Sequence, residues 1–232
     1  MDKEQSLSLC AKGREAWNEW ASERVVVREI MERDGDWETE VIDISGDIEP
    51  ANDVTRIWMD ASSSIFQGHE FKDFADFSGF VFPWHASFDC GGGYYLDSIS
   101  TKFPNGANFS SASFLGDARF DEAIFAEQTN FIATRFADRA IFNCAKFTGN
   151  VTFENAIFEK VASFTREVAF LANASFENTN FLGDAHFKKC KFGDSQNHNN
   201  FSFRLAKFHK FVTFENTTFD GNVSFHGAVL VT

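Results

Sequence analysis

The chain has 232 residues and a formal net charge of −13, and 44% of its residues are hydrophobic. This composition allows a sizeable core, but no apolar run reaches the roughly 20 residues that cross a bilayer, and the charged N-terminus excludes a secretory signal. The chain has 31 Phe and only 2 Tyr, and this ratio indicates aromatic rings buried in a dry interior, where a hydroxyl would find no hydrogen-bond partner. We therefore expect a cytoplasmic protein that has no membrane segment.

The first sixty residues differ from the rest of the chain. Residues 4–33 are predicted to be helical, with Leu9, Ala16, Trp17 and Trp20 available for one face, and irregular strands are expected near residues 41–48. Residues 1–65 carry 16 acids and 7 bases, whereas residues 107–232 carry 13 and 12. The acidity is either a solvated N-terminal region or one pole of a molecule that steers a partner electrostatically.

Phenylalanine recurs through the remaining chain at gaps that alternate between five and six residues. A small residue stands two positions before each ring, as Ala112 does before Phe114. The unbroken stretch, which we predict to be the structural core, comprises Phe109, Phe114, Phe120, Phe125, Phe131, Phe136, Phe142, Phe147, Phe153, Phe158 and Phe164. A repeat this strict predicts stacked units that bury their apolar sides against one another.

The spacing favours strands over helices. A step of five residues rotates a helix by about 140°, which would place alternate rings on nearly opposite sides. In an extended chain, residues i and i−2 face the same side, so Ala112 and Phe114 both point inward while Ser113 points outward. Pro is absent from residues 105–232, as continuous ladders of backbone donors require.

The units resemble the pentapeptide-repeat family, as in Ala118-Arg119-Phe120 followed by Ala123-Ile124-Phe125. The resemblance implies an all-β fold: a right-handed, four-sided parallel β-helix with about 22 residues per coil and seven to eight coils from Phe66 to Leu230. Phe109 should then stack on Phe131 and Phe153. Residues 13–20 resemble a helical leader found in bacterial members, so residues 1–60 should form an α-helical cap on a solenoid of residues 61–232.

Breaks in the repeat are expected near residues 89–106 and 193–202, with a smaller fault between Phe164 and Phe176. They are predicted to be loops or bulges that leave the coil. At the C-terminal end, the repeat pattern continues through residues 223–232. We expect this coil either to form a homodimer or to continue in a longer natural chain.

Catalytic and metal-binding patterns are missing from the sequence. The six His residues lack metal-site spacing, and Gly91-Gly92-Gly93 is not followed by the Lys of a phosphate-binding loop. The four Cys residues are far apart and are expected to be free thiols, with Cys190 standing in for an inward Ala. We therefore expect a protein that is not an enzyme and has no catalytic, cofactor-binding or metal-binding residues.

Two functions stay open. The first is a non-enzymatic scaffold for an unknown protein partner. The second, implied by the quinolone-resistance branch of the family, is an acidic DNA mimic that modulates a type II topoisomerase (DNA gyrase). Direct nucleic-acid binding is not expected, because residues 107–232 carry a net charge of −1.

The candidate partner contacts are Trp84, Tyr94, Tyr95 and His198, which lie in or beside the two main breaks. Exposed Trp and Tyr side chains are common anchors of interfaces. The alternative is that the aromatic side chains fill a defect in the core.

Overall fold

One repeat unit is a two-residue strand followed by a corner. In the computed structural model, which describes residues 1–41, 48–90, 99–194 and 198–231, Ala118 and Phe120 are fully buried while Arg119 is exposed between them. This is the inward-outward alternation of extended backbone. Every second corner is tight: the Phe109 carbonyl oxygen accepts the N–H of Ala112 at 3.0 Å, and Ser111 between them has φ 58°. A tight turn of this kind makes a five-residue step.

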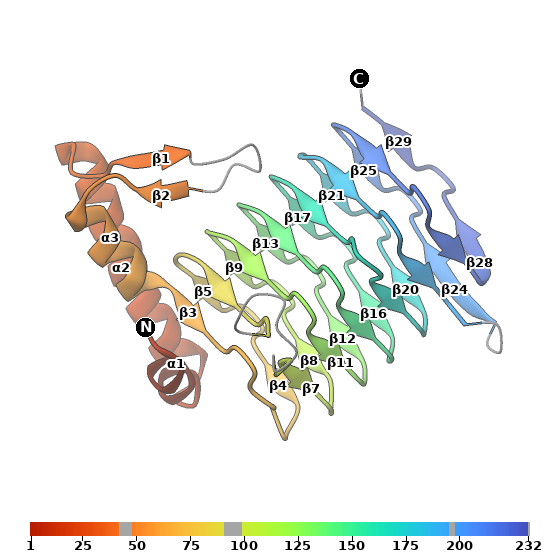
Figure 1. The fold of residues 1–232 in the computed structure, drawn as a ribbon, viewed down its shortest axis with the longest axis horizontal. Helices are drawn as coiled ribbons and strands as arrows, with labels where there is room; N and C mark the ends of the chain where they lie inside the picture. Colours follow the sequence, from red (N-terminus) through yellow and green to blue (C-terminus); the bar gives the residue numbers. More distant parts are fainter. Residues whose placement is uncertain (42–47, 91–98, 195–197, 232) are drawn as a thin grey trace.

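Four such units make one coil, and the coils stack into four parallel sheets, called here faces 1 to 4 (Figure 1). Face 1 contains β3 (Ser64–Ile65), β6 (Ala86–Ser87), β10 (Ala118–Arg119), β14 (Ala140–Ile141), β18 (Ala162–Ser163), β22 (Ala185–His186) and β26 (Val212–Thr213). Face 2 contains β7 (Lys102–Phe103), β11 (Ile124–Phe125), β15 (Lys146–Phe147), β19 (Ala169–Phe170), β23 (Lys191–Phe192) and β27 (Thr218–Phe219).

The other two sheets form the remaining two sides of the four-sided coil. Face 3 contains β4 (Ala75–Asp76), β8 (Ala107–Asn108), β12 (Thr129–Asn130), β16 (Val151–Thr152), β20 (Ala174–Ser175), β24 (Asn199–Ser202) and β28 (Gly221–Ser224). Face 4 contains β5 (Val81–Phe82), β9 (Ser113–Phe114), β13 (Arg135–Phe136), β17 (Ile157–Phe158), β21 (Asn180–Phe181), β25 (Lys207–Phe208) and β29 (Val229–Leu230). The expected four-sided parallel solenoid is confirmed, with about seven turns.

The core consists of four columns of stacked rings. Phe109, Phe131 and Phe153 lie face to face, with centroids 4.8 and 4.7 Å apart and ring planes within 3°. Neighbouring columns meet edge to face, as Phe142 and Phe153 do at 5.5 Å and 89°. The edge-to-face contacts suit the ring quadrupole, and the parallel rings stack at the spacing of the coils. All eleven rings assigned to the core from their spacing are 0% exposed.

The breaks leave the register of the coils intact. Paired residues are 22 apart in most of the body, as in Ala118 and Ala140. The separation is 32 between Val81 and Ser113, and 27 between Lys191 and Thr218. Ten and five extra residues are therefore inserted at the two main breaks, which include segments 91–98 and 195–197 outside the described residues. At the smaller fault one extra residue is accommodated where Arg166 and Glu167 both have positive φ.

The described part of the N-terminal region consists of three helices at the first coil and a hairpin next to α3 (Figure 1). The elements are α1 (Lys3–Cys10), α2 (Arg14–Asp34), β1 (Thr39–Val41), β2 (Ile48–Pro50) and α3 (Asp53–Ser62). The helical span expected over residues 4–33 is interrupted before α2 by Gly13, which has φ 89°. None of the helices in these described ranges is long and apolar enough to span a membrane.

Trp17 makes the central contact between this cap and the coil. Its fully buried ring packs on Phe66 at 5.9 Å and on Phe82 at 5.4 Å, at the start of two ring columns. Its indole nitrogen donates a hydrogen bond to the Val81 carbonyl oxygen at 2.8 Å. The cap therefore covers ring ends that would otherwise face water, as the sequence predicted.

Candidate functional site

The four predicted partner contacts do not form one site. Trp84 is only 3% exposed and lies in a coil next to the cap. His198 is exposed directly before β24, a strand that lies toward the other end of the solenoid (Figure 1). Tyr94 and Tyr95 fall in segment 91–98, outside the described residues, so their role stays a prediction.

Trp84 belongs to a cluster that joins the cap to the solenoid. Its ring meets Trp37, which follows α2, at 5.5 Å, and Trp58 of α3 at 5.7 Å. The guanidinium carbon of Arg28, on α2, lies 4.6 Å from the Trp37 ring centroid and 5.0 Å from that of Trp84. A cation against ring faces is attractive, so this cluster holds the cap in place. Trp84 is thus buried between the cap and the solenoid, in a cluster separate from the ring columns, and its role as a partner contact stays a prediction.

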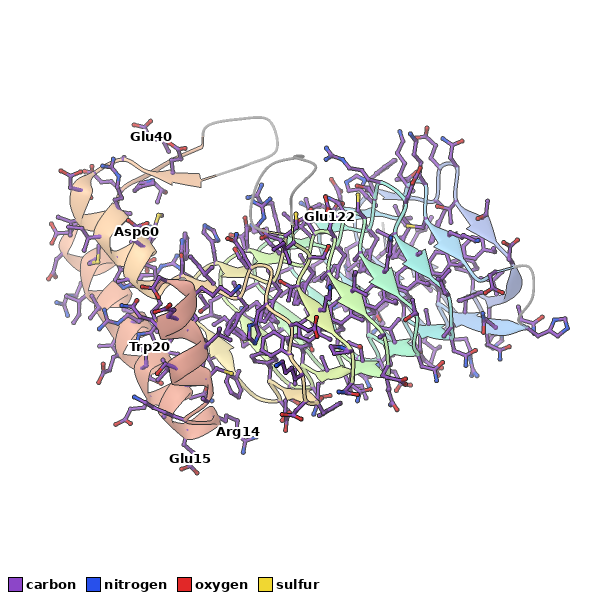
Figure 2. All side chains as sticks on the ribbon, turned by 60° about the horizontal axis from the view of Figure 1, so that its bottom comes forward. Arg14, Glu15, Trp20, Glu40, Asp60 and Glu122 are labelled. Carbon is purple, nitrogen blue, oxygen red and sulfur yellow. The ribbon has the colours of Figure 1, made fainter. Side chains whose placement is uncertain are left out.

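A groove of about 1530 Å³ lies between the cap and face 1. Outward side chains of the first strands of face 1, Ile65, Ser87 and Arg119, line it from the solenoid. The cap lines it with residues of α1, α2 and α3, including Trp20 and Asp60, which are labelled in Figure 2. The groove thus exists only where the helical cap meets the coil.

Apolar side chains in the groove come mainly from the cap. Ile57 of α3 is 69% exposed, although it is a large aliphatic residue. Leu9 and Trp20 are partly buried and line the same groove. Exposed and partly buried apolar side chains in one groove are the kind of surface that a protein segment covers on binding.

The charged groups on the solenoid side are paired with one another. The Arg139 guanidinium donates two hydrogen bonds to the Asp117 carboxylate, one of them from Nε at 3.1 Å. The Asp117 backbone N–H donates to Nδ1 of His85 at 2.9 Å, and Asp117 is only 4% exposed. These pairs shape this wall of the groove.

A second charged network continues beside the first. Nε of Arg119 lies 3.5 Å from the Asp89 carboxylate and 3.7 Å from that of Asp121. Burial raises the pKa of Asp121 to about 6, with a smaller contribution from the Asp89 charge and opposition from Arg119. The described residues contain no group of three His, Cys, Asp or Glu side chains that could hold a metal ion.

Sequence reasoning missed this groove because its residues come from seven separate segments between Met1 and Arg139. One signal was available: Asp117 and Arg139 are 22 residues apart, which is one coil, so they lie directly before two consecutive strands of face 1, β10 and β14. Opposite charges at the coil spacing therefore predict an ion pair on the surface of a solenoid. Ile57 gave no such signal, because α3 was not predicted.

The repeat was compared with known proteins. The family model of pentapeptide repeats, in 9 copies, matches residues 109–157 and 176–229. No curated protein and no solved structure matches the chain. The matched residues include strands of all four faces and rings of all four columns. The chain therefore belongs, through this repeat body, to the pentapeptide-repeat family.

Proposed function

We propose that this chain is a non-enzymatic scaffold that binds a protein segment in the groove between the cap and face 1. The observation that carries the proposal is the groove of about 1530 Å³ with Ile57 exposed on its wall. The stacked rings give the solenoid a rigid frame, so a partner meets a preformed surface. The charge pairs at its edge favour a partner with polar groups around an apolar centre.

The cytoplasmic location stays a prediction. A homodimer formed through the last coil, where Phe225 and Leu230 are 42% and 68% exposed, also stays a prediction. Static light scattering over a range of concentrations checks the homodimer.

The alternative of a DNA mimic acting on gyrase has less support. The outward strand positions from β7 to β29 carry Lys, Arg, His, Asn, Ser, Thr and aliphatic residues, and no Asp or Glu. A DNA mimic needs regularly spaced carboxylates along such faces to imitate phosphates. The acidity of the chain lies instead in residues 1–65.

Two exposed residues of the same helix allow a matched test. We expect the Ile57→Asp variant to lose a protein that the wild type retains in affinity capture from the cells of origin. The Val54→Asp variant should still retain it, because Val54 is 53% exposed on α3 but does not line the groove. Both side chains are exposed, so neither change should unfold the protein. The proposal fails if every protein captured by the wild type is also captured by Ile57→Asp.

A further inference from the structure

Face 3 differs in chemistry from the other three faces. At its outward strand positions β4, next to the cap, carries Asp76, whereas those from β8 to β28 form one row: Asn108, Asn130, Thr152, Ser175, Ser202 and Ser224. From β12 to β28, the residue directly before the inward residue of each strand belongs to a second row. This row consists of Gln128, Asn150, Asn173, Asn200 and Asn222. Both rows consist of amides and hydroxyls alone. We call these two rows the polar strip.

The other faces do not repeat this pattern. Equivalent outward positions include Arg119 and Ile141 on face 1, Lys146 on face 2, and Arg135 and Ile157 on face 4. The coil geometry is the same on all four sides, so the fold alone does not require an uncharged strip on face 3. The strip spans six consecutive coils, and face 3 is the side of the square opposite the groove on face 1.

Local hydrogen bonds orient the hydroxyl row. The hydroxyl oxygens of Thr152, Ser175 and Ser202 each accept the backbone N–H two residues further on, at 3.2, 3.3 and 3.3 Å. These hydroxyls donate to no acceptor in the part of the chain that the structure describes. Each therefore keeps an O–H donor and one acceptor lone pair for solvent or a ligand.

The amide row is also held in place. The Asn150 side-chain oxygen accepts the backbone N–H of Asn173 at 3.1 Å, and the Asn173 oxygen accepts that of Asn200 at 2.8 Å. The amide nitrogens of Asn150 and Asn200 donate to no acceptor among the described residues. The strip thus presents oriented hydrogen-bonding groups that repeat at the coil spacing of about 4.8 Å.

A shallow groove of about 340 Å³ runs along four coils of this strip and is lined by members of both rows. Glu154 and Glu177 follow the hydroxyl row on one side, and Lys146 and Lys191 project from face 2 on the other. The surroundings therefore have no single sign of charge. The strip offers neither the cations that a nucleic acid needs nor the apolar anchors that a protein partner needs.

We propose that the polar strip binds an extended, uncharged polysaccharide. Such a polymer presents hydroxyls and ether oxygens at a regular interval, and one sugar residue is close in length to one coil. Each coil would contribute a weak set of hydrogen bonds. Repetition of this set along the strip would make the binding of the whole polymer specific and strong. Binding should persist in high salt, because no ion pair is involved.

Affinity gel electrophoresis tests the proposal, with soluble β-1,3-glucan, amylose, hydroxyethyl cellulose and mannan as probes. We expect at least one of them to retard the wild type. The triple variant Thr152→Val, Ser175→Ala, Ser202→Ala should bind that probe at least about tenfold more weakly. Thr213→Val is the matched control: its hydroxyl accepts the Glu215 N–H at 3.1 Å in the same way but lies on face 1.

A second variant guards against misfolding of the triple variant. Asn200→Lys keeps the backbone hydrogen bonds of the strip, since among the described residues the Asn200 side-chain oxygen accepts only the side-chain amide of Asn222. It should weaken binding to a similar extent. No retardation by any of the four probes would overturn the proposal, as would equal retardation of the wild type and Asn200→Lys. Binding only to heparin or to unfolded polypeptide would also overturn it.

Discussion

Cys190 occupies a position where most units carry Ala, and it makes a bond that Ala cannot make. Its Sγ donates to the Phe164 carbonyl oxygen at 2.8 Å, just as Thr134 and Thr179 donate to Phe109 and Phe153 at 2.7 and 2.8 Å. Burial raises the pKa of the Cys190 thiol to about 12, so the proton needed for this bond stays on the sulfur. The sequence-based interpretation as a substitute for Ala identified the position and missed the hydrogen bond.

Asp121 gives the chain a pH dependence that can be measured. Burial raises its pKa from 3.8 to about 6, so the folded state binds more protons than the unfolded state between these values. The free energy of unfolding should therefore fall as pH rises from about 4 to 6. Asp121→Asn should stabilise the protein by about 1–2 kcal/mol at pH 7, and the gain should vanish near pH 4.

Urea unfolding at pH 4 and pH 7 measures this difference. The control is Asp73→Asn, because Asp73 is exposed and its loss should change stability by less than about 0.5 kcal/mol at either pH. A destabilising effect of Asp121→Asn at pH 7 would show that the attraction to Arg119 outweighs burial.

Among the elements, the strands follow from the sequence and the cap follows only in part. The alternating gaps predict the inward rings because the two-residue period of a strand holds within every unit. The cap lacks such a period: α3 was not expected, and the strands expected near residues 41–48 fall largely on segment 42–47, outside the described residues, between β1 and β2. Trp37, Trp58 and Trp84 meet only in three dimensions, so no local pattern could predict their cluster.

Arg28 tests how firmly the cap elements are held together. Arg28→Met keeps a long apolar side chain and removes the charge between the Trp rings, so we expect the docking of α2 and α3 to weaken by about 1–2 kcal/mol. Hydrogen exchange should become faster in these helices and stay unchanged in the central coils.

Arg33→Met is the matched control on the same helix. The Arg33 side chain is 70% exposed and, in the part of the chain that the structure describes, pairs with no carboxylate but its neighbour Asp34, so exchange in the cap should not change. Equal exchange in both variants would show that the cation between the rings does not hold the cap.

The whole molecule is a rod whose sides and ends differ. The acidic cap covers one end and forms the groove with face 1, the polar strip runs along face 3, and the last coil exposes apolar residues such as Leu230. Both proposed surfaces depend on coils that keep their register, because each draws its residues from several consecutive turns. The columns of rings supply that register.

The central claim is that these columns hold the coils together, and truncating one ring tests it most directly. Phe153 is 0% exposed in the middle of its column, whereas Phe211 is 61% exposed at a corner. In urea unfolding, Phe153→Ala should lower the free energy of unfolding by about 3–5 kcal/mol, and Phe211→Ala by less than about 1 kcal/mol. Equal losses in the two variants, or a loss below about 1 kcal/mol for Phe153→Ala, would contradict the account.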